Sequence, residues 1–243
     1  MKKLFLRFTA ILTALTLVCV TAVFAAKEPK GIDTNSILAD VLPSVNKKDG
    51  NLTIILDAGH GGEDGGAVGI DGILEKELNL ALAQRTAELL TLMGYTVILT
   101  RNSDRMLGDG TVGHRKVADL KYRLELANST ENALLVSIHM NKFPMEYCNG
   151  IQLYYSGNDE RSLLLANELH RLVKDFQKDN GREVKKADSA IYLLDRAAIP
   201  AVLIECGFLS NGNECALLQE EAYQKKLALL IASAICAYEA GGR

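Results

Sequence analysis

Residues 52–69 read LTIILDAGHGGEDGGAVG, and their pattern gives the first indication of the fold class. Its first part, 52–56, is a short apolar run rich in β-branched residues, which predicts a buried strand. A glycine-rich loop follows, and apolar residues then return at helical spacing over 76–93. Gly94 closes this helix, as glycine often does at a helix C-terminus. A strand, a loop and a helix in this order predict the opening unit of an α/β fold.

The same alternation continues to the end of the chain. We predict further strands over 95–100, 133–139, 151–155, 190–194 and 201–205, and further helices over 116–129, 160–178 and 221–239. Strands that alternate with helices of this length predict a parallel sheet covered on both faces. The expected fold class is therefore a single α/β domain with a mixed, mainly parallel six-stranded sheet and helices on both faces.

The N-terminal segment has the features of a targeting signal. Residues 1–7 carry three basic side chains and no acidic one, an apolar run follows over 8–24, and small residues precede a polar stretch. This order is typical of a secretory signal peptide, so we expect residues 1–25 to be removed on export. An uncleaved anchor stays open, because a run of 17 residues is just short of a bilayer span. We interpret 26–50 as a linker and 51–243 as the catalytic domain.

Composition and charge exclude several classes of protein. The chain has 243 residues, 27 of them basic and 30 acidic, and removal of residues 1–25 changes the net charge from −3 to −6. An acidic exported domain is not expected to bind nucleic acid, and contact with a membrane is expected only through the N-terminal segment. Four of the five cysteines remain in the exported part, which permits three disulfide pairings and selects none.

Polar residues follow three of the predicted strands, at the edge where α/β sheets bind ligands. They are DAGH at 57–60, SIH at 137–139 and ECG at 205–207. His60 and His139 should therefore meet, and Glu75 lies just before the predicted helix, close after the glycine loop. Two imidazoles and one carboxylate form a zinc site that leaves a position open for water. Glu205 is then free to act as the general base.

Other chemistries fit these residues less well. The glycine loop lacks the third glycine of a dinucleotide motif and the lysine of a P-loop, and its acidic residues would repel phosphate. Neither HExxH nor GxSxG occurs. Cys206 follows Glu205 directly on a strand, so the two side chains point to opposite faces, and we expect Cys206 to be a buried packing residue. His114 and His170 are expected at the surface.

Five segments in this order resemble the zinc-dependent N-acetylmuramoyl-L-alanine amidases (amidase type 3), which hydrolyse cell walls. They are LTIILDAGHGGEDGGAVG at 52–69, EKELNLALA at 75–83, TRNSD at 100–104, VSIHMN at 136–141 and PAVLIECGFLSN at 200–211. The resemblance implies that His60, Glu75 and His139 bind Zn²⁺ and that Glu205 is catalytic. It also implies a substrate, peptidoglycan, in which the bond between N-acetylmuramic acid and L-alanine is cut.

Finer features resemble the germination-specific branch of that family, which acts on the spore cortex. They are the segments at 114–128, 137–143 and 150–156, together with Cys206. This resemblance implies a role in muramic-lactam formation, a location outside the cytoplasm in the forespore intermembrane space, and a lipoprotein partner of the kind some members need. Two alternatives stay open: another zinc hydrolase of cell-wall peptides, such as a carboxypeptidase or deacetylase, and a catalytically silent wall-binding regulator.

Overall fold

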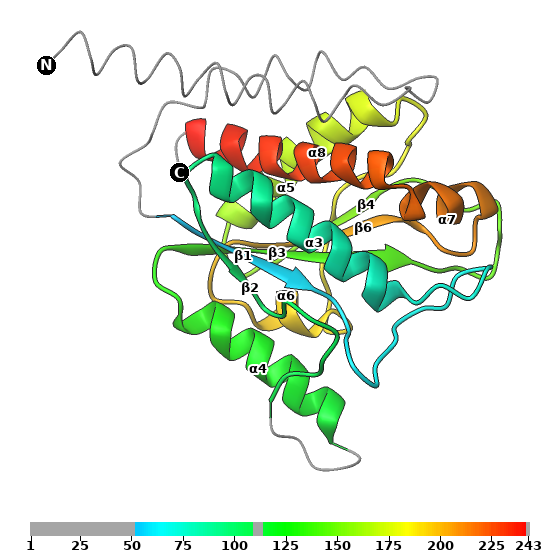
Figure 1. The fold of residues 1–243 in the computed structure, drawn as a ribbon. Helices are drawn as coiled ribbons and strands as arrows, with labels where there is room; N and C mark the ends of the chain where they lie inside the picture. The colour runs from blue at the N-terminus through cyan, green and yellow to red at the C-terminus, as the bar shows by residue number, and fades with distance from the viewer. Residues whose placement is uncertain (1–51, 109–113, 242–243) are drawn as a thin grey trace, which may run out of the picture.

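A computed structural model describes residues 52–108 and 114–241 of the chain (Figure 1). The predicted signal peptide and linker lie outside these described residues. Within them, no helix combines the length and the apolar character that a membrane span requires.

A six-stranded sheet runs through the centre of the described chain, in the order β2-β1-β3-β6-β4-β5. Its members are β1 (Thr53–Ala58), β2 (Thr96–Leu99), β3 (Ala133–Asn141), β4 (Gln152–Tyr155), β5 (Lys185–Lys186) and β6 (Ala201–Phe208). Strands β2, β1, β3 and β6 are parallel, whereas β4 is antiparallel to β6. The predicted mixed, mainly parallel sheet is confirmed, and β1, β3 and β6 end at the same edge.

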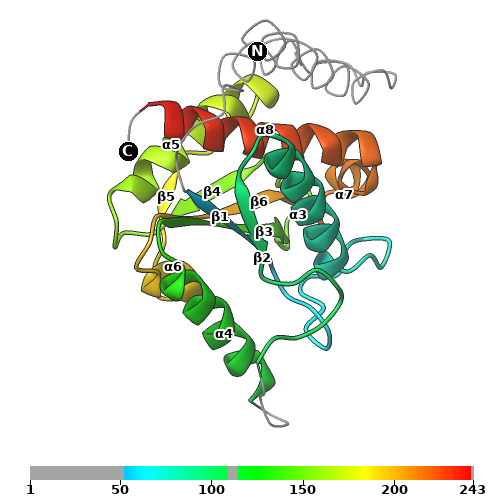
Figure 2. The ribbon, with the colours of Figure 1, turned by 60° about the vertical axis from the view of Figure 1, so that its left-hand side comes forward.

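Helices cover both faces of the sheet, as predicted (Figures 1 and 2). On one face lie α3 (Glu75–Leu92), α5 (Arg161–Phe176) and α8 (Glu221–Ala240), and on the other α4 (Arg115–Ser129) and α6 (Tyr192–Arg196). A further helix, α7 (Gly212–Gln219), was not expected from the sequence. It begins at Asn211, whose side chain accepts hydrogen bonds from two backbone N–H groups of its first turn.

The core consists of two apolar layers, one on each face of the sheet. Successive strand residues point to opposite faces, so Ile54 and Leu56 join the layer under α3, α5 and α8, while Ile55 joins the layer under α4 and α6. Helix α8 lies between α3 and α5 and is buried along nearly its whole length. The central strands β1, β3 and β6 are thus covered on both faces.

The prediction of a strand over 190–194 was wrong. That segment is a turn followed by α6, and the sixth strand is the two-residue β5. Asp188 starts the turn, because its side chain accepts a hydrogen bond from the Ala190 N–H and its carbonyl accepts one from the Ile191 N–H. Leu193 and Leu194 are buried by the short helix. A brief apolar run of this kind does not distinguish a strand from a buried helix.

Candidate metal centre

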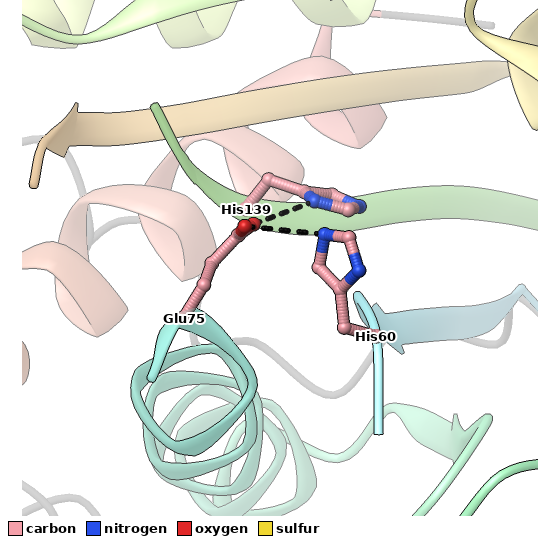
Figure 3. A group of neighbouring side chains, drawn as sticks. All are labelled: His60, Glu75 and His139. Carbon is pink, nitrogen blue, oxygen red and sulfur yellow. Dashed lines mark hydrogen bonds and ion pairs between the residues drawn. The ribbon is translucent and has the colours of Figure 1, made fainter. Parts of the chain in front are cut away.

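Three side chains predicted as metal ligands lie together at the carboxyl edge of the sheet (Figure 3). One ligand atom from each of His60, Glu75 and His139 lies within 4.8 Å of the other two. The Glu75 Oε2 atom is 3.2 Å from His60 Nε2, and its Oε1 atom is 2.9 Å from His139 Nδ1. The two imidazole rings stand edge to face, with centroids 5.0 Å apart. The carboxylate therefore lies against both rings.

The three side chains come from three different elements. His139 lies near the end of β3, Glu75 is the first residue of α3, and His60 lies in the loop after β1. His60 has a φ of 61°, a left-handed conformation that few residues other than glycine adopt. The backbone is turned sharply at this point, which brings the ring back towards the start of α3.

Hydrogen bonds fix the orientation of the Glu75 carboxylate. Its oxygens accept bonds from the backbone N–H of Ala67 at 2.8 Å, the backbone N–H of Met140 at 3.1 Å and the side-chain amide of Asn79 at 3.2 Å. Burial alone would raise the pKa of Glu75, but its contacts with His139 and His60 hold that pKa well below its usual range. The carboxylate is therefore ionised, as a metal ligand must be.

The side chains of the three proposed ligands leave no room for a Cβ atom at two glycines of the loop. A Cβ atom on Gly59 would lie 2.2 Å from the His139 ring. A Cβ atom on Gly66 would lie 2.5 Å from Glu75 Oε2 and 2.7 Å from the His60 ring. The loop therefore wraps closely around the three side chains, and its glycines serve this close approach.

Two buried arginines hold the loop from behind. Arg123 of α4 donates hydrogen bonds to the carbonyls of Ala58 at 2.8 Å and His60 at 2.7 Å. Arg101 donates to the carbonyls of Ala58 at 2.9 Å and Gly59 at 3.0 Å. Neither was predicted as a site residue, since a charged residue in a polar loop or on a helix is normally exposed. The backbone of the loop is thus fixed by guanidinium groups that water does not reach.

Asp57 balances part of this buried positive charge. Its carboxylate contacts Arg123 at 2.5 Å and accepts hydrogen bonds from the hydroxyls of Ser137 at 2.6 Å and Thr100 at 2.8 Å. Burial alone would raise the pKa of Asp57, but the Arg123 charge and the Ser137 hydroxyl outweigh it and bring the pKa to about 2. The pair connects β1 to α4 directly beneath the loop.

Glu205 lies beside the three clustered side chains. It is paired in register with His139 on the adjacent parallel strand. The residue is half-buried. Its Oε2 atom is fully buried and receives no hydrogen bond from the described residues, 52–108 and 114–241. Burial raises the pKa of Glu205 to about 7, with Glu75 adding to the rise and the two histidines opposing it. A carboxyl group with a raised pKa, one of whose oxygens has no hydrogen bond within the described residues, is suited to accept and return a proton.

The remaining sequence predictions have mixed outcomes. Cys206 is 1% exposed, and burial raises the pKa of its thiol, so its role in packing is confirmed. His114 is exposed at the start of α4, as expected. His170 is only half-buried rather than fully exposed, because its ring contacts the carbonyl of Arg182 at 3.0 Å. Within the described part of the chain, no disulfide joins any two of Cys148, Cys206, Cys215 and Cys236.

The donor set fits a divalent transition metal. Two imidazole nitrogens and one carboxylate oxygen are ligands that zinc takes in catalytic sites with a position left open. Hydrogen bonds from the protein fix the cluster, and the carboxyl group of Glu205, on the strand next to that of His139, is a candidate proton acceptor. Such an arrangement is able to bind a cation and hydrolyse an amide or ester.

Comparison with known proteins gives consistent matches. Residues 54–237 match the sequence model of a family described as N-acetylmuramoyl-L-alanine amidase. The chain is 40% identical to the germination-specific N-acetylmuramoyl-L-alanine amidase of Bacillus subtilis, over 76% of this chain and 78% of that protein. It also resembles the structure of the CwlD amidase from Clostridioides difficile in complex with the GerS lipoprotein, with a TM-score of 0.73 and 42% identity over 78% of this chain and 98% of that one.

A second solved structure shares the fold at lower identity. It is that of an N-acetylmuramoyl-L-alanine amidase from Clostridium difficile 630, which has a TM-score of 0.71 and 28% identity over 80% of this chain and all of that one. The matches to all three proteins cover three quarters or more of the chain.

Proposed function

The chain belongs to the family of N-acetylmuramoyl-L-alanine amidases, and we propose that it hydrolyses its amide substrate with a zinc ion held by His60, Glu75 and His139. The bond cut joins the lactyl carboxyl group of N-acetylmuramic acid to the amino group of L-alanine in peptidoglycan. One observation supports this proposal most strongly. The three ligand atoms lie within 4.8 Å of one another, beside a buried carboxyl oxygen of Glu205.

A zinc ion held by these three residues would supply a Lewis acid that polarises the substrate carbonyl and makes a water molecule more acidic. Glu205 Oε2 would accept a proton from the water molecule that attacks the carbonyl carbon. The same carboxyl group then returns the proton to the nitrogen of the departing L-alanine, so that the amide is replaced by a carboxylic acid and a free amine. Burial raises the pKa of this carboxyl group, which makes its carboxylate a stronger base for the first step.

The protein scaffold keeps the reacting groups in fixed positions. The Ala67 and Met140 N–H groups hold the Glu75 carboxylate, and Arg123 holds the carbonyl of His60. Glu205 is fixed relative to His139 by the pairing of β6 with β3. The site is therefore organised before the substrate binds, which lowers the cost of reorganisation during the reaction.

The two alternative functions are less well supported. A carboxypeptidase or a deacetylase would use the same kind of zinc site, but the family match covers residues 54–237 and is to amidases. A catalytically silent wall-binding regulator would not need three metal ligands and an adjacent proton acceptor. This chain has all four of these residues: His60, Glu75, His139 and Glu205.

We further propose a role in the spore cortex. The 40% identity to a germination-specific relative supports it. The protein would act outside the cytoplasm, after export directed by residues 1–25. A lipoprotein partner is proposed because the relative with 42% identity forms a complex with one.

The test is mass spectrometry of peptidoglycan digested by the purified protein, with added zinc and after treatment with a chelator. We expect free stem peptides and intact glycan chains with zinc, and no release after chelation. Shortened stem peptides would instead indicate a carboxypeptidase, and lost acetyl groups would indicate a deacetylase. The spore role is tested separately by analysing cortex from spores that lack the protein, in which we expect muramic lactam to be absent.

A further inference from the structure

Asp64 contacts the side of the His60 ring that faces away from Glu75. The His60 Nδ1 atom lies 2.9 Å from Asp64 Oδ2, while its Nε2 atom lies 3.2 Å from Glu75 Oε2. His60 is thus held between two carboxylates, one at each ring nitrogen. Asp64 has only 22% of its side chain exposed, so this contact is partly shielded from water.

We propose that Asp64 is a positioning residue for the metal, one that holds His60 in the tautomer whose Nε2 atom binds zinc. This inference rests on the proposed zinc site. A neutral imidazole carries one proton, and the hydrogen bond made by one nitrogen determines which nitrogen is left with a lone pair. When Nδ1–H donates to Asp64, the Nε2 lone pair is directed at the space shared with Glu75.

Two features hold Asp64 in this position. Its backbone forms a pair of hydrogen bonds with Gly61, at 2.9 and 3.1 Å, which folds the loop back over His60. Lys116 of α4 lies 3.1 Å from the same Oδ2 atom that His60 contacts. The carboxylate is therefore held from two sides, by the backbone of the loop and by Lys116.

The neighbouring residue Glu63 provides a matched control. It also forms an ion pair with a basic residue of α4, Arg115, but 71% of its side chain is exposed and Arg115 is not one of the proposed metal ligands. Substitution of Glu63 removes the same charge one residue away from Asp64. A difference between the two variants therefore reports the contact with His60 rather than the general charge of the loop.

The experiment measures the zinc affinity of metal-free wild type, Asp64→Ala, Asp64→Asn and Glu63→Gln by competition with a chromophoric chelator. Partners of metal-binding histidines typically contribute 10- to 100-fold to affinity, so we expect Asp64→Ala to weaken binding by about that factor. Asp64→Asn keeps an oxygen acceptor without the charge and should fall between wild type and Asp64→Ala. Glu63→Gln should bind zinc as wild type does, within about threefold.

A second readout separates positioning from a purely structural role. The absorption spectrum of the cobalt-loaded protein should change in Asp64→Ala, because the ring is no longer fixed, and should be unchanged in Glu63→Gln. The melting temperature of each metal-free protein shows whether the fold is retained. Wild-type zinc affinity in both Asp64 variants would overturn the inference, even if they melt earlier. Failure of the wild-type protein itself to bind zinc would instead refute the proposed function.

Discussion

Glu205 and His139 are register partners on the adjacent parallel strands β6 and β3. Paired residues of a sheet direct their side chains to the same face, and neighbouring strands are about 4.8 Å apart. The separation between the proposed proton acceptor and this proposed metal ligand is therefore determined by backbone hydrogen bonds of the sheet rather than by the conformation of a loop. Immediately after this pair the register shifts, at Asn141 and Phe208, so the regular ladder ends where the site begins.

The close approach of the glycine loop leads to a first prediction. Gly59→Ala should abolish zinc binding and activity, because its Cβ would lie 2.2 Å from the His139 ring and displace it. Gly181→Ala is the matched control, since a Cβ there meets nothing within 4 Å. Zinc content and peptide release are measured on both purified proteins. Full zinc binding by Gly59→Ala would show that the ring has room to move.

A second prediction concerns the buried guanidinium group behind the loop. Arg123→Met should lower the free energy of unfolding by about 3–5 kcal/mol, because it leaves buried carboxylates without their charged partner. Asp57 and Asp119 are those carboxylates. Arg115→Met removes an exposed ion pair of the same helix and should cost no more than about 1 kcal/mol. Urea unfolding of both variants measures the difference, and equal losses would contradict the assigned role of Arg123.

The pH dependence of stability provides a third prediction. Asp57 has a folded pKa of about 2 against an ordinary value of 3.8, so its ionised form stabilises the folded state at pH values above about 4. That contribution, about 2 kcal/mol, should be lost as the pH falls from about 4 towards 2. The charged and polar groups around it are Arg123, Ser137, Thr100 and His139.

Urea unfolding of wild type and Asp57→Asn between pH 7 and 3 tests whether the stability contributed by Asp57 falls as the pH falls. The wild type should be the more stable by a constant amount from pH 7 to about pH 4.5, and the gap should narrow below that. A gap that widens on acidification would mean that Asp57 is protonated in the folded protein.

A fourth prediction concerns the metal itself. A ligand that binds only the folded state at 100 times its Kd adds about 2.7 kcal/mol of stability. For a domain of this size that corresponds to a rise in melting temperature of about 5–10 °C. Melting curves of the metal-free protein with and without zinc test this, with magnesium as the control cation. No rise with zinc would argue against a preformed zinc site.

Much of the fold and the four proposed site residues could be predicted from the sequence. The alternating strands and helices define the sheet, and the rule that ligands bind at the carboxyl ends of strands brought His60, His139 and Glu205 into one region. The apolar run at 190–194 was misinterpreted because periodicity over five residues is ambiguous. Helix α7 was missed because it is short and its start depends on the side-chain cap of Asn211.

The supporting residues of the site could not be predicted in the same way. Arg101, Arg123 and Asp57 act through burial and mutual charge, which depend on three segments meeting in space. The sequence predicts only that the acidic residues of the glycine loop repel phosphate, whereas in the structure the Asp64 carboxylate contacts His60. A sequence carries little signal for such contacts, since each residue alone is typical of an exposed loop or helix.

Glu205 is proposed to transfer protons beside a metal held by His60, Glu75 and His139. The most direct test measures zinc content and stem-peptide release together for wild type, His139→Ala and Glu205→Ala. We predict that Glu205→Ala keeps a full zinc ion while its rate falls by about 10²- to 10⁴-fold, and that His139→Ala loses both. Release of stem peptides at the wild-type rate by zinc-loaded Glu205→Ala would refute proton transfer by Glu205.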